Sequence, residues 1–248
     1  MSECRELVDL HCHLMPYVDD GAYDLDECRE LLRSEVLQGV RTICLTPHLR
    51  ADMFESTDEE IDSHFQQVLE LVREEQLPLQ LSCSREYHFD RIFRKRLEEG
   101  ILRPLGRGRT LLVEFGGRDG GEEILEAIAL VRRAGFLPLV AHAERYLPLH
   151  EDWAFAYELR DSGALVQVNA GSILGREGVR QRLLCRKLLK KGLVSAVASD
   201  AHDCQLRKPE LELCFRQLET KYGRGTALRL LSGNPRAILD GKTVRTGE

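Results

Sequence analysis

The feature that most limits how this chain can fold is a unit that recurs along it: an amphipathic segment, then a glycine, then a short apolar run. A glycine suits the left-handed backbone with which many helices end, so each unit predicts a helix and a turn. The apolar runs are nearly continuous, which is typical of strands buried on both faces. The helix-ending glycines stand in Gln38-Gly39, Ala134-Gly135, Ser162-Gly163 and Lys191-Gly192.

Two segments in the first third of the chain carry the start signals of helices. Asp24 and Glu27 have the spacing of a capping box before the first, and Thr57 and Glu60 have it before the second. Apolar residues then recur at helical spacing in both segments. These positions are Leu25, Cys28, Leu32 and Val36, then Ile61, Phe65, Val68, Leu69 and Val72.

Seven apolar runs are predicted to form strands. They lie near residues 7–11, 41–46, 78–83, 110–115, 137–141, 165–169 and 194–198. Helices separate most of them, and this alternation predicts a parallel sheet covered by helices. Seven such units without a low-complexity linker favour closure into a barrel. We therefore predict an α/β fold, a seven-stranded β/α barrel, with residues 1–248 as a single domain.

The charge balance and the apolar pattern narrow the class of protein. A net charge of −6 argues against binding nucleic acid, because such domains normally carry a basic excess. No stretch approaches the roughly 18 apolar residues of a membrane span, and the first residues lack the pattern of a signal peptide. We therefore expect a soluble protein without membrane insertion. The sequence does not indicate its oligomeric state.

The cysteines are scattered and form no C-x-x-C pair, so neither a zinc ribbon nor a disulfide framework is expected. Free thiols suit a reducing cytoplasm. No Cys-x5-Arg loop is present, since Cys185-Arg186 and the stretch from Cys204 to Arg207 have the wrong spacing. A phosphatase with a cysteine nucleophile is therefore not indicated.

The connection between the third and fourth predicted strands is basic. From Arg85 to Arg109 it contains eight Lys or Arg residues. The first interpretation is a solvated helix and loop. The alternative is a positively charged flap that meets an acidic or phosphorylated partner.

Side chains that can bind metal follow the ends of the predicted strands. Because a barrel brings the C-terminal ends of all its strands to one side, residues far apart in sequence can share a site there. Clustered imidazoles and carboxylates are costly to bury without cations, so the set predicts two or three ions that share a carboxylate. Imidazole with carboxylate suits Mn, Fe or Zn, and a metal-dependent hydrolase follows. The candidate ligands are His11, His13, Asp20, His48, Glu86, Glu114, His142, Asp200 and His202.

Four neighbouring residues are left out of this set. Cys12 lies between two ligand histidines and should point away from them into the packing if the strand continues. His64 falls inside an amphipathic helix and is expected at the surface. His88 and His150 precede or begin helices and are expected to cap them or face solvent.

Taken in order, the motifs resemble the polymerase-and-histidinol-phosphatase (PHP) superfamily, and more closely its bacterial protein-tyrosine phosphatase branch. That branch is encoded with capsular and exopolysaccharide synthesis systems. The similarity runs from Leu7 to Asn234-Pro235-Arg236. The motifs that carry it are His11-Cys12-His13, Asp19-Asp20-Gly21, Thr46-Pro47-His48, Glu86, Val113-Glu114-Phe115, Ala141-His142-Ala143-Glu144-Arg145-Tyr146, Gln167-Val168-Asn169 and Ser199-Asp200-Ala201-His202.

The resemblance implies a distorted seven-stranded β/α barrel with a trinuclear, usually manganese, site. One ion would be held by His11, His13, Glu86 and Asp200, a second by Glu86, Glu114 and His142, and a third by Asp20, His48 and His202. Arg145 and Arg207 match positions where the branch places phosphate-binding arginines. One departure is visible, because the branch commonly has Gly two residues before the bridging Glu and this chain has Ser84.

The expected reaction is attack of a metal-bound hydroxide on the phosphorus of a phosphomonoester. Arg145 and Arg207 would bind the phosphate through their forked donors, and His202 or a bound water would supply a proton. The resemblance implies a phosphotyrosine-containing protein as substrate, a membrane-associated bacterial tyrosine kinase of polysaccharide export.

Three alternatives stay open. The same site can serve a small alcohol phosphate such as histidinol phosphate. A 3′ exonuclease fits less well with the acidic balance of the chain. A non-catalytic, kinase-binding regulatory module would be expected to lack ligands, whereas every expected ligand position is filled. The alternative for Arg145 is a surface salt bridge with Glu144 or Asp152.

Overall fold

The computed structural model describes residues 6–244, and its strands all pair in parallel. They form a three-stranded sheet in the order β1-β2-β4 and a six-stranded sheet in the order β3-β5-β6-β7-β8-β9. The strands are β1 (Leu7–Cys12), β2 (Val40–Leu45), β3 (His48–Leu49), β4 (Gln80–Cys83), β5 (Glu86–His88), β6 (Thr110–Glu114), β7 (Leu137–Val140), β8 (Leu165–Asn169) and β9 (Ala196–Ala198). The predicted parallel α/β fold is confirmed.

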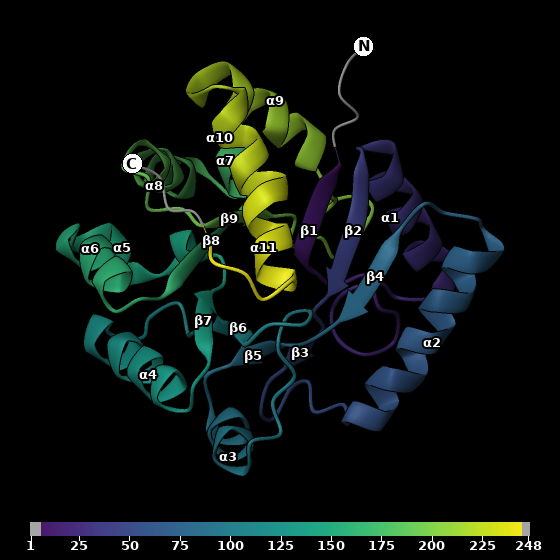
Figure 1. The fold of residues 1–248 in the computed structure, drawn as a ribbon, viewed down its shortest axis with the longest axis horizontal. Coiled ribbons are helices and arrows are strands. Elements are labelled where there is room, and N and C mark those ends of the chain that lie inside the picture. Colours follow the sequence, from purple (N-terminus) through teal and green to yellow (C-terminus); the bar gives the residue numbers. More distant parts are fainter. Residues whose placement is uncertain (1–5, 245–248) are drawn as a thin grey trace.

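Helices surround these strands, and α11 lies over one end of them near β1 and β9 (Figure 1). The α-helices are α1 (Leu25–Leu37), α2 (Asp58–Glu74), α3 (Arg91–Glu99), α4 (Gly121–Arg133), α5 (Leu147–Glu151), α6 (Ala154–Asp161), α7 (Ala170–Leu174), α8 (Val179–Lys190), α9 (Leu211–Tyr222), α10 (Arg224–Leu228) and α11 (Asn234–Leu239). A 3₁₀ turn, η1 (Ala143–Arg145), and a π-helical turn, η2 (Arg229–Gly233), complete the set. Across residues 6–244, no helix is both long enough and apolar enough to cross a bilayer.

The predicted count of seven strands is not confirmed, because two of the expected strands are broken. The chain leaves the three-stranded sheet after β2, at Thr46-Pro47, and enters the six-stranded sheet as β3. Pro47 interrupts the hydrogen bonding because it has no N–H to donate. β4 is broken in the same way at Ser84 and resumes as β5. Ser84 is buried at this break, and its hydroxyl donates to the carbonyl of Arg103 at 2.7 Å.

The sheets approach each other at the ends of β1 and β9. The N–H of His13 donates to the carbonyl of Ala201 at 2.8 Å, and the N–H of Asp200 donates to the carbonyl of His11 at 2.9 Å. The first and last strands of the chain therefore meet where the candidate ligands stand.

The predicted helix signals are largely confirmed. The side chain of Asp24 accepts from the N–H of Glu27, although the Glu27 carboxylate accepts from Tyr23 rather than closing a box with Asp24. Thr57 and Glu60 form both bonds of a capping box. The four helix-ending glycines all have positive φ, at +85° for Gly39, +83° for Gly135, +79° for Gly163 and +68° for Gly192.

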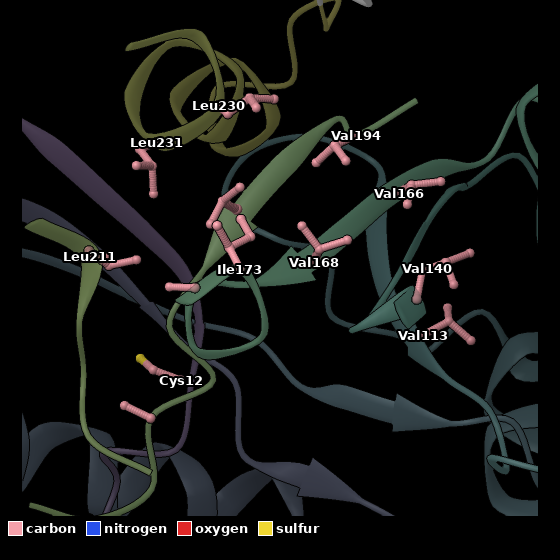
Figure 2. Packing of buried hydrophobic residues seen from close by; sticks show 14 of the residues in the cluster. Cys12, Val113, Val140, Val166, Val168, Ile173, Val194, Leu211, Leu230 and Leu231 are labelled. Carbon is pink, nitrogen blue, oxygen red and sulfur yellow. The ribbon is translucent and has the colours of Figure 1, made fainter. Parts of the chain in front are cut away.

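Both faces of most strands are buried, as the continuous apolar runs predicted, whereas β4 is only partly buried. Along β6, Leu111 and Val113 belong to the larger hydrophobic cluster, whereas Leu112 belongs to a smaller one. Figure 2 shows the larger cluster on neighbouring strands, with Val113, Val140, Val166 and Val168 among its labelled side chains. The smaller cluster is made of Val8, Leu10, Cys44, Leu105, Leu112, Leu139, Ala141, Leu165, Ala196, Ala198, Ile238 and Leu239.

The basic connection from Arg85 to Arg109 does not form a free charged flap. Arg85 is fully buried and reaches Asp58 at 3.3 Å, so it is neither solvated nor available to a partner. Arg96 also pairs with Asp58, and Arg103 pairs with Asp62 through two bonds of 2.6 and 3.1 Å. Acidic residues of α2 thus neutralise three of the eight basic side chains of this segment.

Candidate metal centre

His11 and His13 stand two positions apart at the end of β1 and point toward the same side, as alternate residues of a strand do. The pairing register of β1 with β2 shifts between Asp9 and Cys12. Leu10 packs into the smaller hydrophobic cluster and Cys12 into the larger one, while His11 and His13 meet through their Nε2 atoms at 3.2 Å. The packing role predicted for Cys12 is confirmed.

Glu86, at the start of β5, lies at the centre of the candidate ligands. Its Oε2 is 3.2 Å from His11 Nε2 and from His13 Nε2, and 3.0 Å from His48 Nδ1. Its Oε1 is 2.8 Å from His142 Nε2. Burial raises the pKa of this carboxyl, but the surrounding imidazoles outweigh burial and hold the pKa well below its usual range. The side chain is therefore an anion enclosed by histidines.

Asp200 lies close to His11 and His13, at the end of β1. Its Oδ1 is 3.3 Å from His11 Nε2 and 3.6 Å from His13 Nε2. Asp200 and His142 both have left-handed backbones, with φ of +53° and +28°. Non-glycine residues rarely adopt such angles, and those that do concentrate at sites where a side chain must be aimed.

The remaining ligands lie toward the open side of the cluster. Asp20 Oδ1 is 3.5 Å from His48 Nε2 and 3.5 Å from His202 Nε2, and the Asp20 side chain is 49% exposed. Glu114 reaches His48 at 3.9 Å and His142 at 3.7 Å. All nine predicted ligands are therefore brought together. The groups whose ligand atoms lie within 4.8 Å of one another are His13, Asp20, His48 and His202; His11, Glu86 and His142; His11, His13 and Asp200; and His48, Glu86 and Glu114.

The donor set fits divalent cations. Two ligands about 2.1 Å from one ion, at angles of about 90° to 110°, lie about 3.0 to 3.4 Å apart. The separations around Glu86 Oε2, 3.0 to 3.2 Å, fall in this range. Within the described part of the chain, several of these buried atoms also lack any hydrogen-bond partner, which is costly unless a cation completes them. These atoms are His48 Nδ1, Glu86 Oε2, Asp200 Oδ1 and His202 Nε2.

Two residues that were not predicted to have a role contact the ligand histidines at ring nitrogens or backbone N–H groups. Asp19 Oδ2 accepts from His13 Nδ1 at 2.7 Å and from the N–H of His48 at 2.9 Å. Gln167 Oε1 lies 3.1 Å from His11 Nδ1 and accepts from the N–H of His142 at 2.7 Å. Such contacts orient a ligand and leave its other nitrogen free for metal. A polar Gln inside a buried strand was the available signal for Gln167.

The two candidate phosphate-binding arginines converge on Asp200. Arg145 Nη2 is 2.9 Å and Arg207 Nη2 is 3.0 Å from Asp200 Oδ2. Arg145 also bonds Glu177 at 2.9 Å, so its partners are not Glu144 or Asp152. Both guanidinium groups stay about one third exposed and line a cavity of about 140 Å³ beside the cluster. Positive charge thus stands between the ligands and solvent.

The three excluded histidines have different surroundings. His88 was expected to cap a helix or face solvent, but it ends β5 and lies 3.2 Å from Glu114, which makes it a neighbour of the cluster. His64 lies on α2, half-buried rather than at the surface, with its ring 5.9 Å from that of Tyr17. His150 is the last residue but one of α5 and bonds the carbonyl of Glu144 at 2.8 Å.

Similarity to known proteins extends over nearly the whole chain. A family model described as capsular polysaccharide synthesis, CpsB/CapC, matches residues 7–240. The tyrosine-protein phosphatase CpsB of Streptococcus pneumoniae is 31% identical over 238 residues, which cover 94% of this chain and 98% of CpsB. A solved structure from work on YwqE of Bacillus subtilis and CpsB of Streptococcus pneumoniae, described as metal-dependent tyrosine phosphatases, has a TM-score of 0.90. It is 26% identical and covers 97% of each chain. A phosphotriesterase homology protein of Escherichia coli, 15% identical with a TM-score of 0.62, covers 96% of this chain and 99% of its own and shows similarity of fold alone.

Proposed function

This chain belongs to the CpsB/CapC family of capsular polysaccharide synthesis, and we propose that it is a metal-dependent protein-tyrosine phosphatase. The observation that carries the proposal is Glu86, whose two carboxylate oxygens contact four histidines while it is fully buried. A buried anion among imidazoles with unpaired nitrogens is an arrangement that cations stabilise.

In this proposal the cluster would hold two or three ions, and Glu86 would be shared by the first two sites. His11, His13 and Asp200 complete the first site, Glu114 and His142 the second, and Asp20, His48 and His202 the third. We propose Mn2+ as the metal, with Fe or Zn as alternatives, because imidazole and carboxylate ligands suit these ions. Cations bound there supply an activated water near neutral pH and positive charge for the phosphoryl oxygens.

The residues of the chain do the binding and the orientation. Arg145 and Arg207 stand at the open side with forked N–H donors, so we assign them to the phosphate oxygens, which would replace Asp200 Oδ2 as their partner. The leaving tyrosyl oxygen has an ordinary pKa of about 10 and needs less protonation than an alkoxide. We assign His202 or a bound water as the donor of the proton that this oxygen takes up.

We propose as substrate a phosphotyrosine-containing protein, specifically a membrane-associated bacterial tyrosine kinase of polysaccharide synthesis. The names of the relatives and the family description support this class of substrate. We also place the enzyme in the cytoplasm, where the free thiols found among the described residues would stay reduced.

The barrel is part of the proposal too. If β2 with β3, and β4 with β5, each count as one interrupted strand, the ring has seven members. The parallel bridge of Cys12 with Ala201 supports its closure between β1 and the residues after β9. On this view residues 1–248 form one domain.

The test compares two substrates on the Mn2+-loaded protein and on two variants. We expect the wild type to release phosphate from a phosphotyrosyl peptide far faster than from histidinol phosphate. His142→Ala should lose most of this activity, whereas His64→Ala, a histidine outside the cluster, should keep it. Preference for histidinol phosphate would favour the small-molecule alternative, and no turnover of either would favour a non-catalytic kinase-binding module.

A further inference from the structure

Helix α8 carries positive charge that the rest of the molecule does not neutralise. Its twelve residues include five Lys or Arg and no Asp or Glu, in a chain whose net charge is −6. Elsewhere on the surface, arginines such as Arg103 and Arg176 pair with carboxylates. Within residues 6–244, neither Arg182 nor Arg186 makes an ion pair. Arg182 and Arg186 are therefore available to a partner, whereas Lys187 lies over the Trp153 ring, 3.8 Å from its centroid.

The same helix borders an apolar groove. The groove holds about 290 Å³ and runs between α7, α8 and α9. Its wall includes Val179 and Leu183, which are 74% and 59% exposed and lie one turn apart on α8. Gln217, on α9, links the two other helices of the groove by donating to the carbonyl of Ile173 on α7 at 2.8 Å. The lining residues are Ile173, Val179, Arg182, Leu183, Arg186, Leu189, Gln217, Lys221 and Tyr222, with no acidic side chain among them.

The groove begins beside the candidate metal centre. Val179 follows Glu177 by two residues, and Glu177 bonds Arg145 at 2.9 Å. Glu177 also accepts from Asn169, whose amide reaches Asp200 at 2.8 Å. A polypeptide with one residue at the metal centre can therefore continue along α8 without crossing the molecule.

We propose that this groove docks an acidic segment of the phosphoprotein substrate, with an apolar side chain of that segment against Val179 and Leu183. The inference rests on the proposed phosphatase function and adds a second recognition element to it. Charge complementarity selects an acidic partner, and the apolar lining selects a segment that also carries a Leu or similar side chain. A concave groove suits a peptide better than a lipid surface, which would meet a projecting apolar face.

The test measures kcat/KM at low salt for an acidic phosphotyrosyl peptide that contains a Leu, relative to kcat/KM for p-nitrophenyl phosphate. That small ester carries no flanking peptide, so it reports the chemistry alone. Arg182→Glu with Arg186→Glu should lower the ratio about tenfold or more. The matched control, Arg73→Glu with Arg133→Glu on α2 and α4, changes net charge equally and should leave the ratio within about twofold of the wild type.

A second variant isolates the apolar contact. Leu183 is exposed, so Leu183→Ser should not disturb the fold. It should lower kcat/KM for the Leu-containing peptide several-fold. For a peptide with Ala in place of that Leu, kcat/KM should fall much less. An equal fall in both charge variants would reduce the effect to long-range attraction and overturn the proposal. No fall in either would also overturn it.

Two further measurements distinguish this proposal from its alternatives. Fluorescence anisotropy with the unphosphorylated acidic peptide reports docking even if the wild type turns over neither substrate, so failure of the proposed function and failure of the groove are distinguishable. Vesicles that contain phosphatidylglycerol test the lipid alternative. If the α8 variant lost vesicle binding while its peptide affinity stayed at the wild-type value, the surface would be a membrane contact and the docking groove would be refuted.

Discussion

Asp9 and Ser199 lie 190 positions apart and are joined by two hydrogen bonds. The N–H of Ser199 donates to Asp9 Oδ1 at 3.1 Å, and the Ser199 hydroxyl donates to Asp9 Oδ2. Asp9 Oδ1 also accepts from the N–H of His11 at 3.3 Å. The pair is buried between the first and last strands. Ser199 comes directly before Asp200, and Asp9 stands two residues before His11. It therefore fixes the spacing of two candidate ligands from opposite ends of the chain.

Removing the hydroxyl bond of this pair should loosen the metal centre. Ser199→Ala leaves a buried carboxylate oxygen without its donor, which we expect to cost about 1 to 3 kcal/mol in the free energy of unfolding. Metal affinity should fall about 10- to 100-fold, as when other groups that hold ligands are lost. Chemical unfolding and metal titration measure the two effects. Ser63→Ala, on the exposed face of α2, is the control; if both variants retained metal equally, the pair would have no such role.

A second buried acid beside Asp9 should make stability depend on pH. Glu35, on α1, is fully buried, and burial together with the charge of Asp9 raises its pKa well above its usual value. The unfolded chain releases this proton near pH 4 to 5, whereas the folded protein keeps it to higher pH. The free energy of unfolding should therefore fall as pH rises above about 5, by at most about 1.4 kcal/mol per pH unit.

Glu35→Gln has no proton to lose at this position. The decline between pH 5 and 8 should become shallower in the variant, as measured by urea unfolding at each pH. Glu59→Gln, on the solvent side of α2, should follow the wild type. Parallel curves for the wild type and Glu35→Gln would contradict the account.

Gln167 should act through the histidines that it holds. Because its carbonyl oxygen contacts both His11 and the backbone of His142, Gln167→Ala releases two candidate ligands at once. We expect metal affinity to fall about 10- to 100-fold with little change in secondary structure. Metal titration followed by circular dichroism checks this, with Gln66→Ala on α2 as the control. Unchanged affinity in Gln167→Ala would show that the histidines need no such support.

Thiol chemistry should be irrelevant to turnover. Burial raises the pKa of Cys44 to about 12 and that of Cys83 to about 11, so neither is a ready nucleophile. Alkylation of the native protein with iodoacetamide should leave phosphatase activity within about twofold, whereas a chelator should abolish it until Mn2+ returns. The reverse pattern, with activity sensitive to alkylation and resistant to chelation, would exclude the proposed mechanism.

The fold was predictable to the extent that its signals are local. Gly39, Gly135, Gly163 and Gly192 end helices because no side chain blocks the left-handed backbone, and that information lies within a few residues. The breaks after β2 and β4 were not predicted, because each depends on which distant strand the next segment pairs with. The second half of each broken strand is only two or three residues long, too short to form a pattern.

The candidate site was predictable because parallel strands deliver their ends to one side. His11 and Asp200 could be brought together by that rule alone. The supporting contacts were not predictable from spacing, since Gln167 reaches His11 and His142 from another strand. His88 was misassigned for a related reason: the short strand β5 extends through it and places it against Glu114.

Counting the metal ions bound per chain tests the central claim most directly. Elemental analysis of the Mn2+-loaded protein after removal of free metal should give two or three ions per chain. Glu86→Ala should bind at least one ion fewer, because the proposed bridge is lost. A wild-type protein that holds no ion, or a count that Glu86→Ala leaves unchanged, would contradict the account.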